Sequence, residues 1–378
     1  MLNLTCMMKI FLPVLLFVSI SISAQTKKPL DHAVYDGWKS VGERMISNDG
    51  QYTVYAINPQ EGDGDLVIQH TKTLEKKMVA RGYGAVITED SRYVVFKIKP
   101  IFQETRQAKI KKKKADDMTK DSIGIVELGK DVVMKFARIK GFKTPEKGFG
   151  YLAYQLEKAL PDTTKKVKKA PVVDSAKANI DMLVKLADSV IRKSVESVVE
   201  ETAMKDADGD DASGAGASAE GTDLVVRRLS DGKEKTFKLV SDYVFDKKGT
   251  RLALKTTKNA KDSNSIALVL LYNLQLEKTD TLMRNLNDGK NFSFDEEGTQ
   301  LAFVAERDSS TKALQKFYKL WYYTVGQDSA KLVAEKNTVG MQIGFTISDN
   351  ATIRFSKDGK KLFFGTTRIT PAKDTTLV

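Results

Sequence analysis

The chain has 378 residues, of which 41% are hydrophobic, and a formal net charge of +12 at pH 7. This length and apolar content allow a large core and exclude a small scaffold held by disulfides, because the only cysteine is Cys6. Much of the positive charge lies in short runs such as Lys111–Lys114 and Lys165–Lys169, which lack the interleaved aromatic residues that stack on bases. We therefore interpret these runs as solvated loops and expect no nucleic-acid partner.

Residues 1–24 have the pattern of a signal peptide. Lys9 provides a positive n-region, residues 10–20 are apolar, and Ala24 ends a small-residue cleavage site. The apolar run is too short to span a bilayer comfortably. We expect an exported protein, periplasmic or secreted, with no stable membrane span and a mature chain that starts at residue 25.

One short pattern recurs along the mature chain: an apolar arm, a polar turn and a second apolar arm. In the clearest copy, Ser293–Ala305, Gly298 supplies the backbone conformation of the turn, and Leu301 and Phe303 fall on one face of the second arm. The copies span residues 46–57, 87–98, 145–157, 244–256, 293–305 and 354–366. The copy at 145–157 is the weakest, with one extra residue after its glycine, Gly148. A base period of about 40–45 residues, lengthened by insertions, is typical of four-stranded propeller blades.

Further strand candidates lie between these hairpins. In chain order they span residues 66–70, 77–80, 123–128, 132–142, 223–239, 265–274, 279–286, 317–325 and 330–337. Residues 27–42 form a lead-in to the first hairpin, with Trp38 as an expected packing anchor. The polar stretch 103–122 is predicted to be an insertion between strands of the second blade.

The longest insertion spans about residues 160–222. Apolar residues from Ile180 to Val198 recur at steps of three and four, which predicts a helix. An acidic, small-residue linker follows it up to Gly221. Packing against the outside of the domain is the simplest role for this helix, and a docking or oligomer surface is the alternative.

These patterns predict an all-β fold: a β-propeller of about six or more four-stranded blades, with a helical and low-complexity insertion at 160–222. The propeller is expected to occupy residues 25–378. The last blade is incomplete, because the sequence reaches Val378 just after its inner hairpin. Since such an end leaves an unpaired strand edge, we expect the front part of a longer polypeptide or the product of a premature stop.

No residue of the chain is predicted to be catalytic or to bind a cofactor or metal. The sequence contains no G-x-S-x-G nucleophile motif, and His32 and His70 are interpreted as surface or packing histidines. The acidic stretch 206–211 resembles a calcium loop, but Asp211 stands where the glycine of that loop belongs and Ala217 where its bidentate glutamate belongs. It is interpreted as linker.

The stretch 31–66, DHAVYDGWKSVGERMISNDGQYTVYAINPQEGDGDL, resembles the start of exported prolyl oligopeptidase-type (S9) serine peptidases of the kind found in Bacteroidetes. The recurring hairpins are also similar to the TolB-type and WD40-like propeller repeats of that family. This resemblance implies an N-terminal propeller that restricts a hydrolase site to short peptides, followed by an α/β-hydrolase domain with a Ser-Asp-His triad. No position of this chain matches the triad.

Two functions follow as expectations. In the first, the chain is the non-catalytic, substrate-gating propeller region of such a peptidase, acting on short peptides together with a hydrolase domain that this chain does not contain. In the second, it is a TolB-like propeller that binds protein partners in the cell envelope. Some dipeptidyl peptidases of this superfamily hold the substrate amino group with a pair of glutamates on an insertion. Glu200 and Glu201 match that pair by only two letters and are interpreted as a solvated helix end.

Overall fold

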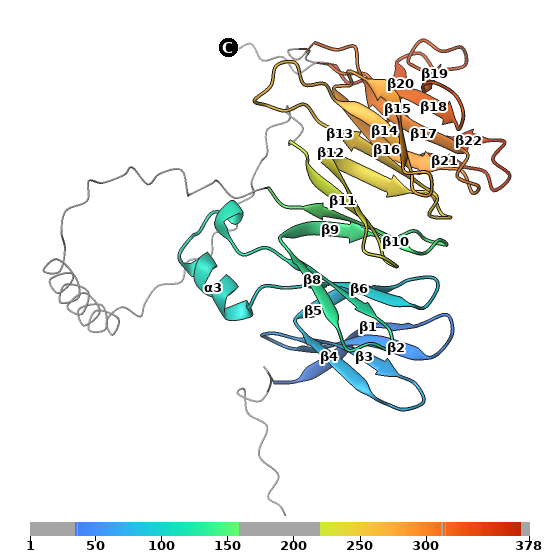
Figure 1. The fold of residues 1–378 in the computed structure, drawn as a ribbon. Helices are drawn as coiled ribbons and strands as arrows, with labels where there is room; N and C mark the ends of the chain where they lie inside the picture. The colour runs from blue at the N-terminus through green and yellow to red at the C-terminus, as the bar shows by residue number, and fades with distance from the viewer. Residues whose placement is uncertain (1–34, 36, 159–219, 311–312, 314, 372–378) are drawn as a thin grey trace, which may run out of the picture. The chain divides into compact units, whose positions relative to one another are not determined.

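The computed structural model describes residues 35, 37–158, 220–310, 313 and 315–371. Almost all regular structure in these residues is β, as the sequence predicts (Figure 1). The strands are β1 Lys39–Ile46, β2 Tyr52–Pro59, β3 Asp65–His70, β4 Lys76–Ala80, β5 Gly82–Ile87, β6 Tyr93–Ile98, β7 Ser122–Glu127, β8 Val133–Ala137, β9 Ile139–Lys143, β10 Tyr151–Leu156, β11 Thr222–Arg228, β12 Glu234–Phe245, β13 Arg251–Thr256, β14 Leu268–Asn273, β15 Lys278–Arg284, β16 Asp288–Phe294, β17 Gln300–Glu306, β18 Lys319–Thr324, β19 Lys331–Ala334, β20 Phe345–Ile347, β21 Arg354–Phe355, β22 Leu362–Phe363 and β23 Thr366–Arg368.

The strands pair as antiparallel meanders in chain order. Three sheets have four strands each: β1 to β4, β5 to β8, and β16 to β19. The described part of the chain therefore contains the four-stranded sheets expected of propeller blades. The number of blades stays a prediction.

The remaining large sheet has seven strands, β9 to β15, and it combines two such meanders through the long strand β12. The first part of β12, up to Val240, pairs with β11, whereas its last part, up to Phe245, pairs with β13. Both pairings shift register beside Val240, and the adjacent Leu239 has a positive φ of 56°. We call each four-stranded meander a repeat. The third repeat is β9 to β11 with the first part of β12, and the fourth is the last part of β12 with β13 to β15.

A sixth repeat begins with two short strand pairs. β20 pairs with β23, and β21 pairs with β22. In the described residues, β22 and β23 have a partner strand on one side only. Phe363 and Phe364 at this edge are 56% and 37% exposed, so apolar surface accompanies the unpaired backbone.

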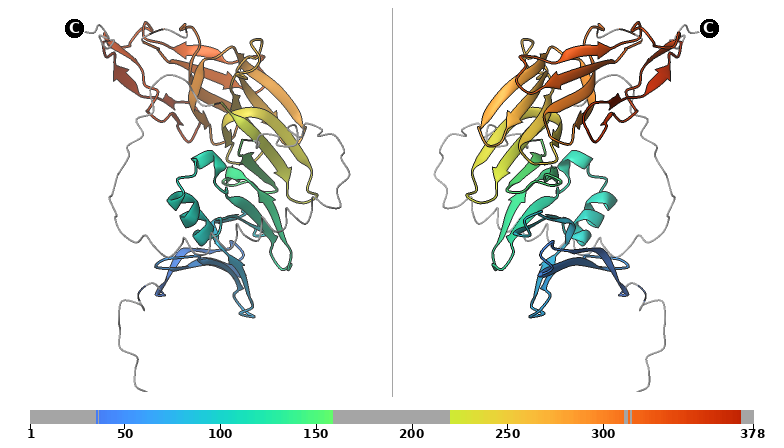
Figure 2. Two further views of the ribbon diagram at one scale, coloured as in Figure 1. Left: turned by 90° about the vertical axis from the view of Figure 1, so that its left-hand side faces the viewer. Right: turned by 90° about the vertical axis from the view of Figure 1, so that its right-hand side faces the viewer.

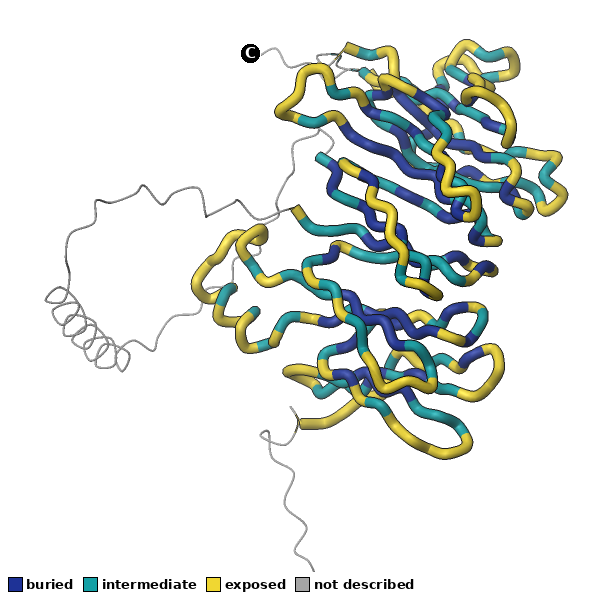
Figure 3. The backbone as a smooth tube through the Cα atoms, in the orientation of Figure 1, coloured by how far each residue is buried: buried dark blue, intermediate teal, exposed yellow. Residues whose placement is uncertain are grey.

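Five apolar clusters hold consecutive repeats face to face. The cluster between the fourth and fifth repeats contains Leu301 and Phe303, both 0% exposed, with Leu271 and Met283 from the preceding sheet. Leu301 and Phe303, which the sequence places on one face of the strand, therefore both pack between two consecutive sheets. Figure 3 shows the same distribution along the chain, with buried residues in the strands and exposed residues at the connections.

The recurring polar turns have a common backbone conformation, which glycine adopts more readily than other residues. The positive-φ residues that close them are Gly50, Ser91, Gly249, Gly298 and Gly359, with φ between 56° and 70°. The turn of the third repeat differs. There the positive φ belongs to Gly150 (84°), directly before β10, instead of the predicted Gly148. A Cβ on Gly148 would lie 2.1 Å from the carbonyl oxygen of Lys248, so this glycine permits a close approach between two turns.

Left-handed residues also mark the passages from one repeat to the next. They are Arg81, Arg138, Leu239 and Asn285, with φ of 56° to 63°. In three of these passages the carbonyl oxygen of the left-handed residue accepts the backbone N–H of the first residue after the second strand of the next repeat. Lys99 donates to Arg81, Glu157 to Arg138 and Thr257 to Leu239. Each bond extends the pairing between the first two strands of the next repeat, which offsets the conformational cost of about 1–2 kcal/mol for a residue with a Cβ.

Some expectations are wrong in detail. The predicted strand 132–142 is two strands, because the left-handed Arg138 separates β8 from β9. Trp38 is 53% exposed and contacts Tyr35 edge to face, so it is not buried as a packing anchor. The insertion after β6 contains a helix, α3 (Phe102–Ile110), which lies outside the strands of its sheet (Figure 2). The signal peptide at 1–24 and the helix predicted within 160–222 lie outside the described residues.

Candidate functional site

The two ends of the sheets carry different connections. At one end are the compact polar turns, for example the one between β16 and β17. The other end carries the connections from the second to the third strand of each repeat. These span residues 60–64, 99–121, 157–221, 257–267 and 307–318. Long connections are where binding sites concentrate in sheet proteins, and we call this second end the insertion end.

The first strand of most repeats leaves one edge unpaired and carries polar side chains that reach the next repeat. Glu43 on β1 accepts the backbone N–H of Gly84 on β5 at 2.6 Å. Lys97 at the end of β6 donates to the carbonyl oxygen of Lys140 on β9 at 3.4 Å. Lys143 on β9 in turn donates to the carbonyl oxygen of Tyr243 on β12. We call this series of contacts the polar row.

The polar row continues through the last two repeats. Lys255 on β13 forms an ion pair of 2.8 Å with Asp288 on β16. Asn291 on β16 donates from its amide nitrogen to two carbonyl oxygens of the sixth repeat, those of Asp349 and Ala351, at 2.9 Å each. Lys290 forms an ion pair of 2.8 Å with the Asp349 carboxylate. Charged and amide groups therefore follow one another along the first and second strands of successive repeats.

Asp288 is the most strongly constrained acid in this row. Its two carboxylate oxygens accept hydrogen bonds from Lys255 at 2.8 Å and from the Tyr318 hydroxyl at 2.6 Å. Burial raises the pKa of Asp288, but the bonds from Lys255 and Tyr318 outweigh it and the pKa is lowered overall. The pKa of Tyr318 is raised by burial and by its bond to the Asp288 carboxylate. Both groups are therefore held in their ordinary ionisation states near neutral pH, which suits a fixed polar surface better than proton transfer.

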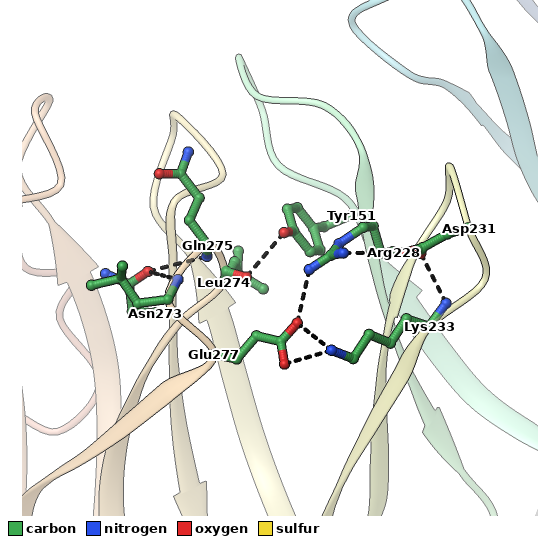
Figure 4. A network of polar contacts seen from close by, with 9 residues as sticks. Tyr151, Arg228, Asp231, Lys233, Asn273, Leu274, Gln275 and Glu277 are labelled. Carbon is green, nitrogen blue, oxygen red and sulfur yellow. Dashed lines mark hydrogen bonds and ion pairs between the residues drawn. The ribbon is translucent and has the colours of Figure 1, made fainter.

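A second polar network joins the third and fourth repeats at the end that carries the compact turns. Figure 4 shows Glu277, after β14, pointing toward Arg228 and Lys233 of the β11–β12 hairpin. The ion pairs measure 2.9 Å to Arg228 and 2.7 Å to Lys233, and they lower the pKa of Glu277. The hydroxyl of Tyr151 donates to the carbonyl oxygen of Leu274 at 3.0 Å. Each charge has a partner, so the network acts as a clamp between repeats.

A shallow groove of about 330 Å³ lies between β1 and β5. Its walls are about equally polar and apolar, and Asn48 at one end donates to the carbonyl oxygen of Glu89 at 3.0 Å. The other lining residues are Met45, Ile46, Ala85, Val86, Ile87 and Thr88. The groove is thus bordered by unpaired strand edges, and it offers an apolar contact beside backbone groups.

The residues singled out in the sequence do not meet in one place. His70 is the last residue of β3, and its Nδ1 accepts the backbone N–H groups of Lys72 and Thr73 in the following turn at 3.3 and 3.1 Å. His32, the Glu200–Glu201 pair and the acidic stretch 206–211 lie outside the described residues. Within the described ranges, no three His, Cys, Asp or Glu side chains are grouped so that they could hold a metal ion. The helices of those ranges include none that is long and apolar enough to cross a membrane.

Sequence reasoning missed the polar row and the clamp. Their members are ordinary lysines, acids and amides that are separated in the chain by about one repeat, as Lys255 and Asp288 are. The only signal was the repeat itself. Superposing the hairpins would have placed these positions on neighbouring strands, although without a register for the side chains.

No protein-family model matches the chain, and no curated protein matches it. Among solved structures, the chain is similar to the β-propeller domain of the trilobed protease from Pyrococcus furiosus, with 9% identity over 88% of this chain and 79% of that one and a TM-score of 0.39. It is similar to the acylaminoacyl peptidase of Pyrococcus horikoshii, with 10% identity over 86% of this chain and a TM-score of 0.37, and it spans 43% of that protein's length. An oligogalacturonate lyase in complex with manganese gives 12% identity over 85% of this chain and 72% of that one, with a TM-score of 0.37. Two of these three neighbours are peptidases and one is a lyase, and the TM-scores are too low to carry a function to this chain.

Proposed function

We propose that the chain is the substrate-gating propeller region of an exported prolyl oligopeptidase-type serine peptidase that acts on short peptides. The hydrolysis would take place on a separate α/β-hydrolase domain. The role of this chain is to expose a polar, shape-restricted surface that admits short extended peptides and excludes folded chains. Such a role depends on geometry more than on any single reactive group.

The observation that carries the proposal is the polar row on the first and second strands of the repeats. Unpaired strand edges offer backbone donors and acceptors to an extended peptide, and charged groups such as Lys143 and Asp288 stand beside them. The resemblance of residues 31–66 to the start of this peptidase family supports the same function. The groove between β1 and β5 provides room for a side chain of such a peptide.

The first test is the downstream reading frame and the protein it encodes. We expect it to continue in frame beyond Val378 and to reach a G-x-S-x-G motif. The full-length product should cleave proline-containing peptides of a few residues and leave longer chains uncut. A stop codon directly after Val378, or equal cleavage of short peptides and unfolded proteins, would overturn the proposal.

A matched pair of variants tests the gating role itself. Asn291→Ala removes two hydrogen bonds between the fifth and sixth repeats, so the full-length enzyme should accept longer peptides while its kcat on a tripeptide stays the same. Asn273→Ala is the control, because Asn273 only accepts N–H groups within its own turn. An identical length limit in both variants would contradict the gating role of the polar row.

The second candidate function is a TolB-like binding module without chemistry. It is favoured by the groove between β1 and β5, which has mixed polar and apolar walls beside an unpaired strand edge and needs no hydrolase domain to bind a ligand. A natural stop after Val378 would support this function over the first. The chain of 378 residues alone is expected not to cleave proline-containing chromogenic dipeptides in either case. Cleavage that a serine-directed inhibitor abolishes would contradict this expectation.

A further inference from the structure

The insertion after β6 presents a helix that contributes nothing to the core. None of the residues of α3 is buried. The helix is followed by the run Lys111–Lys114, in which every residue is exposed, and Figure 3 shows this insertion as largely exposed. Most short helices in proteins are stabilised by packing of an apolar face, so a helix without one requires another explanation.

The first turn of α3 is attached to the loop between β2 and β3. The backbone N–H of Phe102 donates to the carboxylate of Asp63 at 3.1 Å, and Arg106 lies 3.9 Å from Glu61. Beyond Arg106, no ion pair involves Lys109 or Lys111–Lys114 within the part of the chain that the structure describes. The start of the helix is held in place, while its positively charged end faces outward.

The end of α3 carries a lysine where helices usually have glycine. The N–H of Lys112 donates to the carbonyl oxygen of Lys109, and the N–H of Lys113 donates to that of Ala108, which is the Schellman arrangement. Lys112 itself has a positive φ of 50°. A residue with a Cβ is strained there and glycine is not, so folding alone would favour glycine at this position.

Apolar side chains accompany these charges. Ile101 is 40% exposed and Ile110 is 71% exposed, one at each end of the helix. Exposed isoleucines beside a cluster of lysines are typical of segments that lie at a membrane surface, where the lysines meet lipid phosphates and the apolar side chains enter the interface. A nucleic-acid site would instead be expected to offer aromatic side chains for stacking.

We propose that α3 and Lys111–Lys114 form a peripheral docking surface for a phospholipid bilayer with anionic headgroups. Each lysine near such a surface contributes about 1 kcal/mol, equivalent to about a fivefold change in binding. The lysines supply the attraction, and Ile110 adds a shallow apolar contact. The proposal stands independently of the proposed peptidase function, since it uses no residue of the polar row.

Co-sedimentation of the chain with lipid vesicles tests this surface directly. We expect binding to vesicles that contain phosphatidylglycerol and phosphatidylcholine, and no binding to vesicles of phosphatidylcholine alone. Binding should disappear at about 1 M salt, where the Debye length falls to about 3 Å. Equal binding to both kinds of vesicle, or binding that persists at high salt, would overturn the proposal.

Two charge-matched variants show whether the effect belongs to this segment. Replacing all four lysines of Lys111–Lys114 by glutamine should weaken vesicle binding by about a hundredfold or more. Replacing Lys331, Lys357, Lys360 and Lys361 by glutamine removes the same charge from exposed positions elsewhere, and binding should remain within a few-fold of the unchanged chain. Equal losses in both variants would mean a general charge effect and would contradict the assignment.

Lys112→Gly separates docking from folding. This change relieves the backbone strain at the end of α3, so the Tm should stay the same or rise, while vesicle binding falls about fivefold. Unchanged binding would overturn the role of Lys112. A short DNA duplex and an acidic polypeptide serve as competing ligands. If either binds more tightly than the anionic vesicles through the same four lysines, the lipid assignment is wrong.

Discussion

The carboxylate of Asp246 in the fourth repeat lies directly against the bare Cα of Gly298 in the fifth. A Cβ added to Gly298 would stand 2.4 Å from Oδ2 of Asp246, which is far inside van der Waals contact. Asp246 is 0% exposed, so its side chain has no free space to retreat. This glycine is therefore required twice, once by its positive φ of 70° and once by its neighbour.

Gly298→Ala should destabilise the protein more than Gly50→Ala does. Both residues have a φ near 70°, and the strain of alanine there is about 1–2 kcal/mol. Nothing lies within 4 Å of a Cβ at Gly50, whereas at Gly298 the added methyl meets the buried carboxylate. Chemical denaturation of the two variants measures the difference directly. Equal losses of unfolding free energy would mean that the contact with Asp246 relaxes at no cost.

Asp246→Ala should lower the unfolding free energy by about 3 kcal/mol. The carboxylate accepts the backbone N–H groups of Thr250 and Arg251 at 2.7 and 2.8 Å and the Thr250 hydroxyl at 2.6 Å. Removing it leaves buried donors without partners, which costs more than the net value of the bonds. Asp49→Ala is the comparison, because Asp49 accepts hydrogen bonds in an exposed turn, and we expect a clearly smaller loss there. Similar losses in thermal and urea unfolding would contradict this ranking.

The stability that Asp288 contributes should depend on pH in the acid range. Its pKa is lowered in the folded protein, so this contribution is complete above the unfolded value of about 3.9 and is lost as the pH falls toward the folded pKa. Asp288→Asn should flatten the stability profile below about pH 4 and reduce stability at neutral pH. Urea unfolding at a series of pH values checks this. A variant profile parallel to that of the unchanged chain would show that other acids carry the dependence.

The clamp between the third and fourth repeats should show a small, salt-dependent energy. Glu277 is partly exposed, so Glu277→Gln should lower the unfolding free energy slightly at low salt and less at high salt. Tyr151→Phe removes a hydrogen bond to the Leu274 carbonyl and should cost about 1 kcal/mol at either salt concentration. Denaturant unfolding at two ionic strengths distinguishes them. If the loss of unfolding free energy in Tyr151→Phe depended on salt, the Tyr151 hydroxyl would act through the neighbouring charges.

The sequence predicted the compact turns because their conformation depends on a few adjacent residues. In some of these turns a serine or threonine binds the backbone, as at Ser47, whose hydroxyl donates to Asp49 and accepts the N–H of Tyr52. In other turns an aspartate occupies the position of the serine or threonine, as at Asp246 and Asp295. Both kinds satisfy the same backbone groups, so both are visible as one polar pattern in the sequence.

Other features have no local signature. The left-handed conformations at Arg81 and Leu239 are set by hydrogen bonds to the next repeat, and neither residue type is typical of that conformation. The helix α3 was missed because it has no apolar stripe. The polar row depends on the register of strands that are about a repeat apart, as for Asn291 and Asp349, and composition does not reveal that register.

The continuous strand β12 determines where the protein can flex. Backbone hydrogen bonds extend without a break from β9 to β15, so the third and fourth repeats form one stiff body. The neighbouring junction between the fourth and fifth repeats relies on side chains, such as the ion pair of Lys255 with Asp288, together with a backbone bond from Ala330 to Leu282. Side-chain contacts can open and re-form more easily than a paired sheet. Hinge motion between repeats is therefore confined to the junctions on either side of this stiff centre.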